Sequence, residues 1–317
     1  MWRSIFKQNP LHNFENLTKF TSTTLKCCTK GMANSRFEYV KTFEQSDSLL
    51  KNCWIVIRVD GKGFHKFCTA HNFRKPNDKR GLNLMSLAAV HVMQEFNEIV
   101  IAYGQSDEYS FVFKRDSSIY GRRRDKLISY VASLFTSAYI FNWQYIFEDT
   151  VPLKYPPVFD ARAVLYPTDV NLRDYLSWRQ ADVHINNLYN TSFWNLVASG
   201  LTNNDAEKRL SGTLSSDKNE ILFKEFNINY NNEPIMFRKG TTLLRKKVKL
   251  TDGKSLSLTV PIFDDMIVDK FWEIHPELLD SKLNDTDPLD IGDNINHILL
   301  QYQIEKHNKR KEGPERK

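Results

Sequence analysis

The segment CWIVIRVDGKGFH, residues 53–65, carries the pattern on which the interpretation of the fold depends. From Cys53 to Val59 it is apolar and rich in β-branched residues, and it then changes abruptly to Asp60-Gly61-Lys62-Gly63. A buried strand that meets a tight turn has this pattern, because glycine accepts the backbone angles that a turn requires. We therefore predict a central strand that ends at Asp60.

Periodic segments on the C-terminal side of this strand extend the prediction. Asn77-Asp78 can cap a helix, and apolar residues then recur at helical spacing as far as Phe96. The further predicted elements are strands at 99–103 and 109–113 joined by a polar hairpin tip at 104–108, a helix at 122–147 and a strand at 158–166. The order strand, helix, strand, strand, helix, strand is that of the ferredoxin-like split βαβ unit. We therefore predict an α+β fold, a ferredoxin-like or polymerase-palm βαββαβ sheet.

The rest of the chain is predicted to be a helical and β-hairpin C-terminal extension of this unit. Residues 169–230 are mainly helical in pattern, and residues 240–260 form a basic hairpin that turns at Asp252-Gly253. The predicted division is an N-terminal extension at 1–31, a palm-like catalytic domain at 32–167, a helical and hairpin region packed on it at 168–275, and a charged tail at 276–317. From Asn308 onward the charged sequence predicts disorder.

Composition limits the class of protein. The 317 residues are 41% hydrophobic and carry a formal charge of +6, which suits a globular protein with a polyanionic partner. The four cysteines form no C-x-x-C pair, so neither a zinc ribbon nor a disulfide scaffold is indicated. No apolar run approaches the roughly 20 residues that cross a bilayer, so we expect no membrane partner.

The first 31 residues are basic, rich in hydroxyl groups and almost free of acids, as mitochondrial transit peptides are. Met32 provides an internal start after them. The expected location is the cytoplasm, the mitochondrion or both, with the nucleus left open. A leader that carries no address is the alternative.

Three carboxylates are predicted to meet at one edge of the sheet. In the ferredoxin-like topology the first strand lies beside the third, which brings Asp60 toward Asp107 and Glu108 at the hairpin tip. Converging carboxylates repel one another unless a cation compensates them, and oxygen ligands favour Mg²⁺. A pair of Mg²⁺ ions is the usual device for in-line attack on a nucleoside triphosphate. Gly61 and Gly63 would let backbone N–H groups approach phosphates, and Lys62, His65 and Lys75 add positive charge.

An RNA-recognition module is the alternative interpretation of the same topology. Tyr109, Phe111 and Phe113 alternate on the third strand, as do the base-stacking aromatics of such modules. However, those modules place a basic residue and a glycine before the aromatics, where this chain has Asp107 and Glu108. Carboxylates repel RNA phosphates unless metal ions intervene, so we predict that the aromatics belong to the core.

Several stretches together resemble the eukaryotic type of tRNA-His guanylyltransferase. The resemblance runs from about Ser35 to Gly240 in order and spacing, with one departure at Lys62, where the family usually has Arg. The stretches are FEYV at 37–40, DGKGFH at 60–65, KPND at 75–78, YGQSDEYSFVF at 103–113, HINNLYN at 184–190, DKNE at 217–220 and FNINY at 226–230.

The resemblance implies a role for each of these sites. Asp60, the Gly61 carbonyl and Asp107 would hold two Mg²⁺ ions, with Asp60, Asp107 and Glu108 as the catalytic carboxylates. GTP would lie against Asp60, Gly61, Lys62, Gly63, Phe64, His65, Ser106 and Asp107. Lys75, Asn77 and Arg162 would contact the triphosphate or the tRNA 5′ end, and His184, Asn187, Lys218, Asn229, Lys239 and Arg245 would contact tRNA.

The implied reaction uses ATP and GTP. ATP would adenylylate the 5′ phosphate of tRNA-His, and the 3′-hydroxyl of GTP would then displace AMP, so that nucleotide addition runs from 3′ to 5′. The resemblance also implies a homotetramer. A related 3′-5′ polymerase that repairs 5′-truncated tRNAs is the alternative enzyme, and a diguanylate cyclase and a non-catalytic RNA-binding module are more distant ones.

Overall fold

The computed structural model describes residues 35–250, 253–280, 289 and 296–312, with side chains to residue 310. The predicted N-terminal extension, Asp252 and the last five residues lie outside the described residues. The chain divides into two compact units, Met1–Gln45 and Ser46–Lys317. In the first, the 3₁₀ helix η1 (Glu38–Phe43) carries most of the FEYV stretch. The sheet and the helices that pack on it belong to the second unit.

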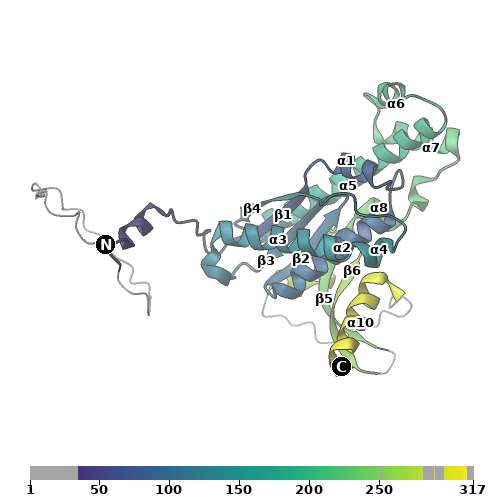
Figure 1. The fold of residues 1–317 in the computed structure, drawn as a ribbon. Helices are drawn as coiled ribbons and strands as arrows, with labels where there is room; N and C mark the ends of the chain where they lie inside the picture. Colours follow the sequence, from purple (N-terminus) through teal and green to yellow (C-terminus); the bar gives the residue numbers. More distant parts are fainter. Residues whose placement is uncertain (1–34, 251–252, 281–288, 290–295, 313–317) are drawn as a thin grey trace, which may run out of the picture. The chain divides into compact units, whose positions relative to one another are not determined.

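A six-stranded antiparallel sheet forms the centre of this unit (Figure 1). Its strands lie in the order β4 (Phe159–Tyr166), β1 (Trp54–Gly61), β3 (Glu108–Phe113), β2 (Ile99–Gln105), β5 (Thr241–Lys249) and β6 (Ser255–Ile262). The predicted α+β class and the predicted place of the first strand beside the third are confirmed. The sheet is wider than the predicted four strands, because β5 pairs with β2 and so adds the C-terminal hairpin to the same sheet.

Helices cover both faces of the sheet. On one face α2 (Lys79–Glu95), α3 (Arg124–Phe141) and α4 (Trp143–Phe147) bury the main core, which includes Ile55, Ile57 and Val59 of β1. On the other face α5 (Asp169–Ala198) packs against Trp54 and Val56 of the same strand. This division follows from the alternation of side chains along a strand.

The ends of the helices agree with the sequence only in part. Asp78 caps α2 as predicted, its side chain accepting a hydrogen bond from the Arg80 N–H at 3.0 Å. The helix predicted at 122–147 begins two residues later and is divided at Asn142, whose side chain donates back to the Ala138 carbonyl at 2.7 Å. Such local side-chain bonds compete with the helical ladder.

The helix that follows the glycine turn was not predicted. Directly after the glycine turn the chain forms α1 (Phe64–Ala70), which buries Phe64 and Phe67. The helix spans only seven residues, and its periodicity is too short to be recognised beside a turn.

The long helix α5 is fixed to the sheet by the buried side chain of Gln180. Its amide donates to the carbonyls of Lys239 and Asp264, each at 3.0 Å, and its oxygen accepts from the Met266 N–H at 2.6 Å. These bonds join α5 to the end of α8 (Ile235–Lys239), directly before β5, and to the chain that follows β6. The predicted helical region continues with α6 (Asn203–Leu210) and α7 (Ser215–Phe226), which pack on α5 through small cores of their own.

The remaining short elements connect these layers. They are η2 (Ile119–Arg122), η3 (Tyr230–Asn232), α8 (Ile235–Lys239), α9 (Asp269–Ile274) and η4 (Pro276–Leu278).

The segment predicted as a charged tail contains a docked helix, α10 (Ile298–Glu312). Leu299 and Leu300 are buried, and the Gln303 side chain bonds both the N–H and the carbonyl of Thr259 on β6, each at 2.9 Å. The prediction of disorder from Asn308 is therefore wrong as far as Glu312. The apolar first turns anchor the helix, and the charged residues that follow continue it.

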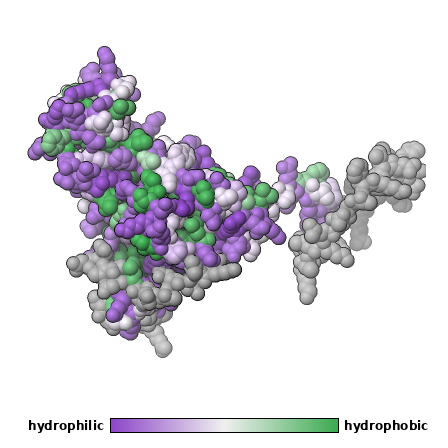
Figure 2. All heavy atoms as spheres, turned by 180° about the vertical axis from the view of Figure 1, so that it is seen from behind, coloured by the Kyte–Doolittle hydropathy of each residue, from purple (hydrophilic) through white to green (hydrophobic). Residues whose placement is uncertain are grey.

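Within the described residues no helix is long and apolar enough to cross a membrane. On the surface seen from behind in Figure 2, hydrophobic patches are separated by hydrophilic side chains.

Candidate active site

The end of β1 and the β2–β3 hairpin tip are held together by the backbone. Asp60 is paired in register with Glu108, and the Gly61 N–H donates to the Asp107 carbonyl at 3.0 Å. The predicted meeting of these three acidic residues at one edge of the sheet is therefore confirmed.

Burial makes the two hairpin carboxyls costly to ionise. It raises the pKa of Asp107, to which the negative charge of Asp60 adds, while a hydrogen bond with the Ser106 side chain opposes the rise. Burial also raises the pKa of Glu108, against the opposing effect of the Arg179 and Arg58 charges. A site of this kind gains free energy from a bound cation, which removes the repulsion between Asp60 and Asp107.

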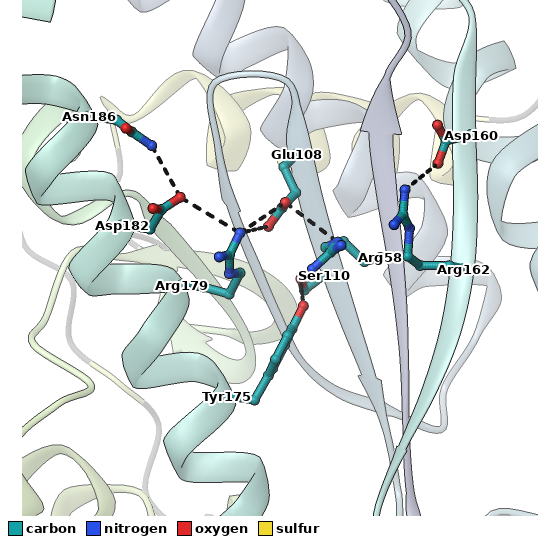
Figure 3. Close-up of polar contacts among 9 residues, drawn as sticks. All are labelled: Arg58, Glu108, Ser110, Asp160, Arg162, Tyr175, Arg179, Asp182 and Asn186. Carbon is teal, nitrogen blue, oxygen red and sulfur yellow. Dashed lines mark hydrogen bonds and ion pairs between the residues drawn. The ribbon is translucent and has the colours of Figure 1, made fainter.

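Glu108 differs from Asp107 in its surroundings. Its carboxylate lies 3.3 Å from the Arg179 guanidinium and 3.5 Å from that of Arg58, on the face of the sheet that α5 covers (Figure 3). The described residues contain no group of three or more His, Cys, Asp or Glu side chains placed to hold a metal. Glu108 is paired with two arginines. The candidate metal ligands are therefore Asp60, Asp107 and backbone oxygen.

The glycine turn brings the backbone close to the hairpin. A Cβ atom at Gly61 would lie 2.3 Å from the Phe64 ring and 3.0 Å from the Asp107 Cβ, so only glycine fits there. Gly63 has a φ of +65°, which glycine adopts without strain. The prediction that the turn offers its N–H groups to phosphate needs correction, because those of Gly61 and Lys62 already donate to the carbonyls of Asp107 and Val158.

A cleft of about 670 Å³ opens beside these residues. Of the predicted site residues, Asp60, Phe64, His65, Lys75, Asn77, Ser106, Asp107, Glu108 and Asn187 line it. Residues of α5 that the sequence did not single out form much of the opposite wall, among them Arg179, Asp182, Asn186 and Trp194.

Two predicted residues that are distant in sequence meet in this cleft. The Asn77 side-chain amide donates to the Asn187 side-chain oxygen at 2.9 Å, and Asn187 in turn donates to the Tyr230 hydroxyl at 2.9 Å. The Lys75 ammonium lies 5.2 Å from the centre of the Trp194 ring. The loop before α2 is thus held against α5, with a cation at its rim.

The remaining predicted residues lie outside the cleft lining. Arg162 is exposed on β4 and lies 3.4 Å from Asp160. His184 makes an edge contact with the Tyr230 ring, and burial together with the charges of Lys239 and Arg238 lowers its pKa. Lys218 donates to the Thr213 carbonyl at 2.7 Å, and Asn229 accepts from the Asn231 N–H at 3.0 Å.

The basic hairpin does not present its cations on one face. Arg245 donates to the carbonyls of Met93 in α2, Asn97 in the following turn and Ile99 in β2, and Lys246 is buried against Glu277 at 2.7 Å. Lys239 pairs with Asp265. Only Lys247 and Lys249 of the β5 cations are exposed, because Lys246 points to the opposite face of the strand and Arg245 is covered by its contacts near α2.

The sequence reasoning missed an arginine and carboxylate network on the α5 side of the sheet (Figure 3). Arg179 of α5 reaches Glu108 and lies 3.7 Å from Asp182, while Tyr175 and Ser110 share a hydrogen bond of 2.7 Å. A signal was available, because Tyr175, Arg179, Asp182 and Asn186 recur at the spacing of one helical face.

The aromatic residues of β3 are buried, as predicted. Tyr109 is 1% exposed, and Phe111 and Phe113 are completely buried. They cannot stack RNA bases, which removes the main argument for an RNA-recognition module.

Comparison with known proteins gives concordant matches over most of the chain. A family model described as tRNAHis guanylyltransferase matches residues 37–167, and one described as Thg1 C terminal domain matches residues 170–311. A probable tRNA(His) guanylyltransferase of Drosophila melanogaster is 60% identical over 249 residues, which are 78% of this chain and 86% of that protein. One of Homo sapiens is 55% identical over 267 residues, 78% of this chain and 89% of that protein.

Solved structures agree with these matches. The tRNA(His) guanylyltransferase of Saccharomyces cerevisiae superposes with a TM-score of 0.62 at 46% identity, over 70% of this chain and 95% of that one. A bacterial guanylyltransferase-like protein in complex with ATP has the same fold, with a TM-score of 0.63 at 21% identity over 78% of this chain and 100% of that one.

Proposed function

The chain belongs to the tRNA-His guanylyltransferase family, and from that premise we propose that its cleft adds a guanylate from GTP to the 5′ end of tRNA-His. The convergence of Asp60 and Asp107 beside the cleft is the observation that supports this most directly. Carboxylates at the strand ends of a ferredoxin-like sheet are also the arrangement expected of a polymerase palm. The proposal therefore includes a palm-type catalytic domain.

The donor set fits Mg²⁺. Asp60, Asp107 and the Gly61 carbonyl would hold two ions. Burial raises the pKa of Asp107 and the nearby charge of Asp60 adds to the rise, so a cation bound there would favour the ionised carboxylate. Bound there, Mg²⁺ supplies charge neutralisation on the attacking and departing oxygens of phosphoryl transfer.

The side chains of the cleft would position two substrates in turn. In the first step the tRNA 5′ phosphate attacks the α-phosphorus of ATP, and pyrophosphate leaves. In the second step the 3′-hydroxyl of GTP attacks the activated 5′ phosphorus, and AMP leaves with the bonding electron pair. Asn77, fixed by Asn187, and Lys75 at the rim would bind triphosphate oxygens, since a cation and an amide held in place provide directed donors.

The replacement Asp107→Asn tests whether one site serves both steps. It keeps the shape of the side chain and removes its charge, so both steps should fall by orders of magnitude while tRNA binding stays nearly intact. Labelled GTP is supplied with tRNA-His that carries either a 5′ monophosphate or a 5′ triphosphate, and the triphosphate form bypasses adenylylation. Asp160→Asn is the matched control, because Asp160 is paired with Asp60 on the other side of β1 but does not line the cleft.

The proposal fails if wild-type protein transfers no guanylate to tRNA-His. The single-site part fails if the Asp107→Asn protein loses activity on the monophosphate tRNA and keeps a normal rate on the triphosphate tRNA.

The homotetramer implied by the family resemblance is part of the proposal. Exposed apolar side chains at the end of α3, Ile140 and Phe141, would suit a subunit contact. Sedimentation velocity of the purified chain measures the assembly directly.

A further inference from the structure

An aromatic hollow outside the cleft lies between the edge strand β4 and α5. It measures about 560 Å³ and is lined by Tyr166, Pro167, Asn171, Asp174, Tyr175 and Trp178. Trp178 is 56% exposed, although a large indole is normally covered by its own protein. None of these six residues lines the cleft, so the nucleotides that bind in the cleft do not account for the hollow.

The indole of Trp178 is supported by the neighbouring arginine. The Arg179 guanidinium lies 3.4 Å from the centre of the ring, and the same guanidinium is 3.3 Å from the carboxylate of Glu108. Because Arg179 is held by that carboxylate and in turn contacts the indole, the Trp178 side chain is already restricted. A ligand that stacks on the ring therefore costs little side-chain conformational entropy. A single arginine side chain therefore separates the exposed indole from the acidic edge of the sheet.

The other wall of the hollow is equally well fixed. Tyr175 shares a hydrogen bond with Ser110 at 2.7 Å, and its ring lies 5.0 Å from that of Tyr166 at an interplanar angle of 32°. The hollow is thus a preformed surface.

Cations lie between the hollow and the acidic edge. Arg58 is paired in register with Arg162, just as Asp60 is paired with Asp160. Each arginine is two residues from the aspartate on its own strand, so their Cα atoms are about 7 Å apart. Arg162 is exposed, and its one ion pair, at 3.4 Å to an exposed Asp160, is of a kind that contributes little to stability. Its guanidinium can therefore exchange that carboxylate for a phosphate of the substrate.

We propose that Trp178 stacks an unpaired nucleobase of the tRNA acceptor end, and that Arg162 contacts a phosphate of the same strand. Aromatic rings backed by arginine, with cations alongside, bind single-stranded nucleic acid through base stacking and backbone contacts. The acceptor end carries the unpaired 3′ nucleotides directly beside the 5′ end on which the reaction occurs. The inference rests on the proposed function and adds to it the surface that positions the acceptor.

The test compares Trp178→Ala and Trp178→Phe on two tRNAs. One is intact tRNA-His, and the other is the same tRNA without its unpaired 3′ nucleotides. Stacking of one base on an aromatic side chain implies that Trp178→Ala raises the Kd for intact tRNA about 5- to 150-fold. Trp178→Phe, which keeps a ring, should cause a smaller rise. For the shortened tRNA, wild-type protein itself should bind more weakly, and the two variants should match it. Tyr130→Ala, which removes a 43% exposed ring on α3, is the matched control and should leave both Kd values unchanged.

Two outcomes would overturn the inference. One is an equal loss of affinity for the two tRNAs, or no loss for either. The other is a change in sedimentation of the Trp178→Ala protein with unchanged tRNA affinity, which would identify the hollow as a contact with a second copy of the chain. Absence of guanylate transfer by wild-type protein would instead contradict the proposed function, and the binding comparison would still report on the stacking.

Discussion

Replacing Arg179 by methionine should produce a loss of stability that depends on pH. Methionine keeps much of the apolar length of arginine but removes the charge that faces Glu108 at 3.3 Å. The two side chains are only 10% and 19% exposed, so water screens the pair weakly. Removing one partner of a buried pair costs about 3–5 kcal/mol where the remaining charge is left uncompensated. Here Arg58 stays 3.5 Å from Glu108, so the expected cost is lower, about 1–3 kcal/mol. The remaining charges near Glu108 are Arg58, which stabilises its ionised form, and Asp60, which opposes it.

The sign of the pH dependence follows from the carboxyl. Burial raises the pKa of Glu108 in the native protein, and loss of Arg179 raises that pKa further. A carboxyl whose pKa is raised on folding contributes stability at low pH, and this contribution is lost as the pH rises through the folded pKa. The variant should therefore lose about 1–3 kcal/mol at pH 8, where Glu108 ionises with Arg58 as its remaining partner. At pH 5 the loss should be smaller, because a larger fraction of Glu108 is protonated.

Urea unfolding of wild type and variant at both pH values measures these differences. In a Glu108→Gln background the same replacement should lose its pH dependence, because the group that titrates is gone. Arg162→Met is the matched control, since its pair with Asp160 is exposed and should contribute less than about 1 kcal/mol at either pH. Equal losses at pH 5 and pH 8 would refute the reasoning, because they would show that Glu108 does not depend on the arginine charge.

Three further changes have definite expected results. A protein that begins at Met32 should transfer guanylate normally. The leader has the composition of a targeting peptide, so tagged full-length protein should be found in mitochondria and the shortened form should not. Replacing Lys247 and Lys249 by glutamate should reduce the slope of log Kd for tRNA against log salt concentration by up to about one unit per cation removed. GTP binding should not change. An unchanged slope would mean that these cations do not contact RNA. Gly104→Ala should lower the free energy of unfolding by about 1–3 kcal/mol or more, because its Cβ would lie 2.2 Å from the buried ring of Tyr109, and an unchanged urea midpoint would contradict this packing.

The local elements around the acidic edge could be predicted because their signals are local. The change from apolar strand to glycine turn after Val59, the cap at Asp78 and the alternation on either side of the hairpin tip each depend on neighbouring residues. Together with the order of the elements, they predict the pairing of the first and third strands and hence the proximity of Asp60 and Asp107.

The charges of the C-terminal hairpin show the limit of that reasoning. A run of cations in sequence suggested a single RNA-binding face, but α2 covers Arg245, and strand geometry turns Lys246 to the other face, into a buried pair with Glu277. Protein contacts both faces of β5, with α2 on one face and η4 on the other. The composition of the hairpin carries no information about either contact.

By itself, therefore, the sequence determined the ferredoxin-like order of the elements, the acidic edge and the resemblance to a family. Only the tertiary structure decided what surrounds that edge. Arg179 meets Glu108 across 71 residues of chain, and Asn77 meets Asn187 across 110. Both contacts exist because Gln180 and the apolar face of α5 fix that helix across the sheet. The position of one packed helix relative to a distant strand depends on the shapes of both surfaces, which the periodicity of either segment alone does not specify.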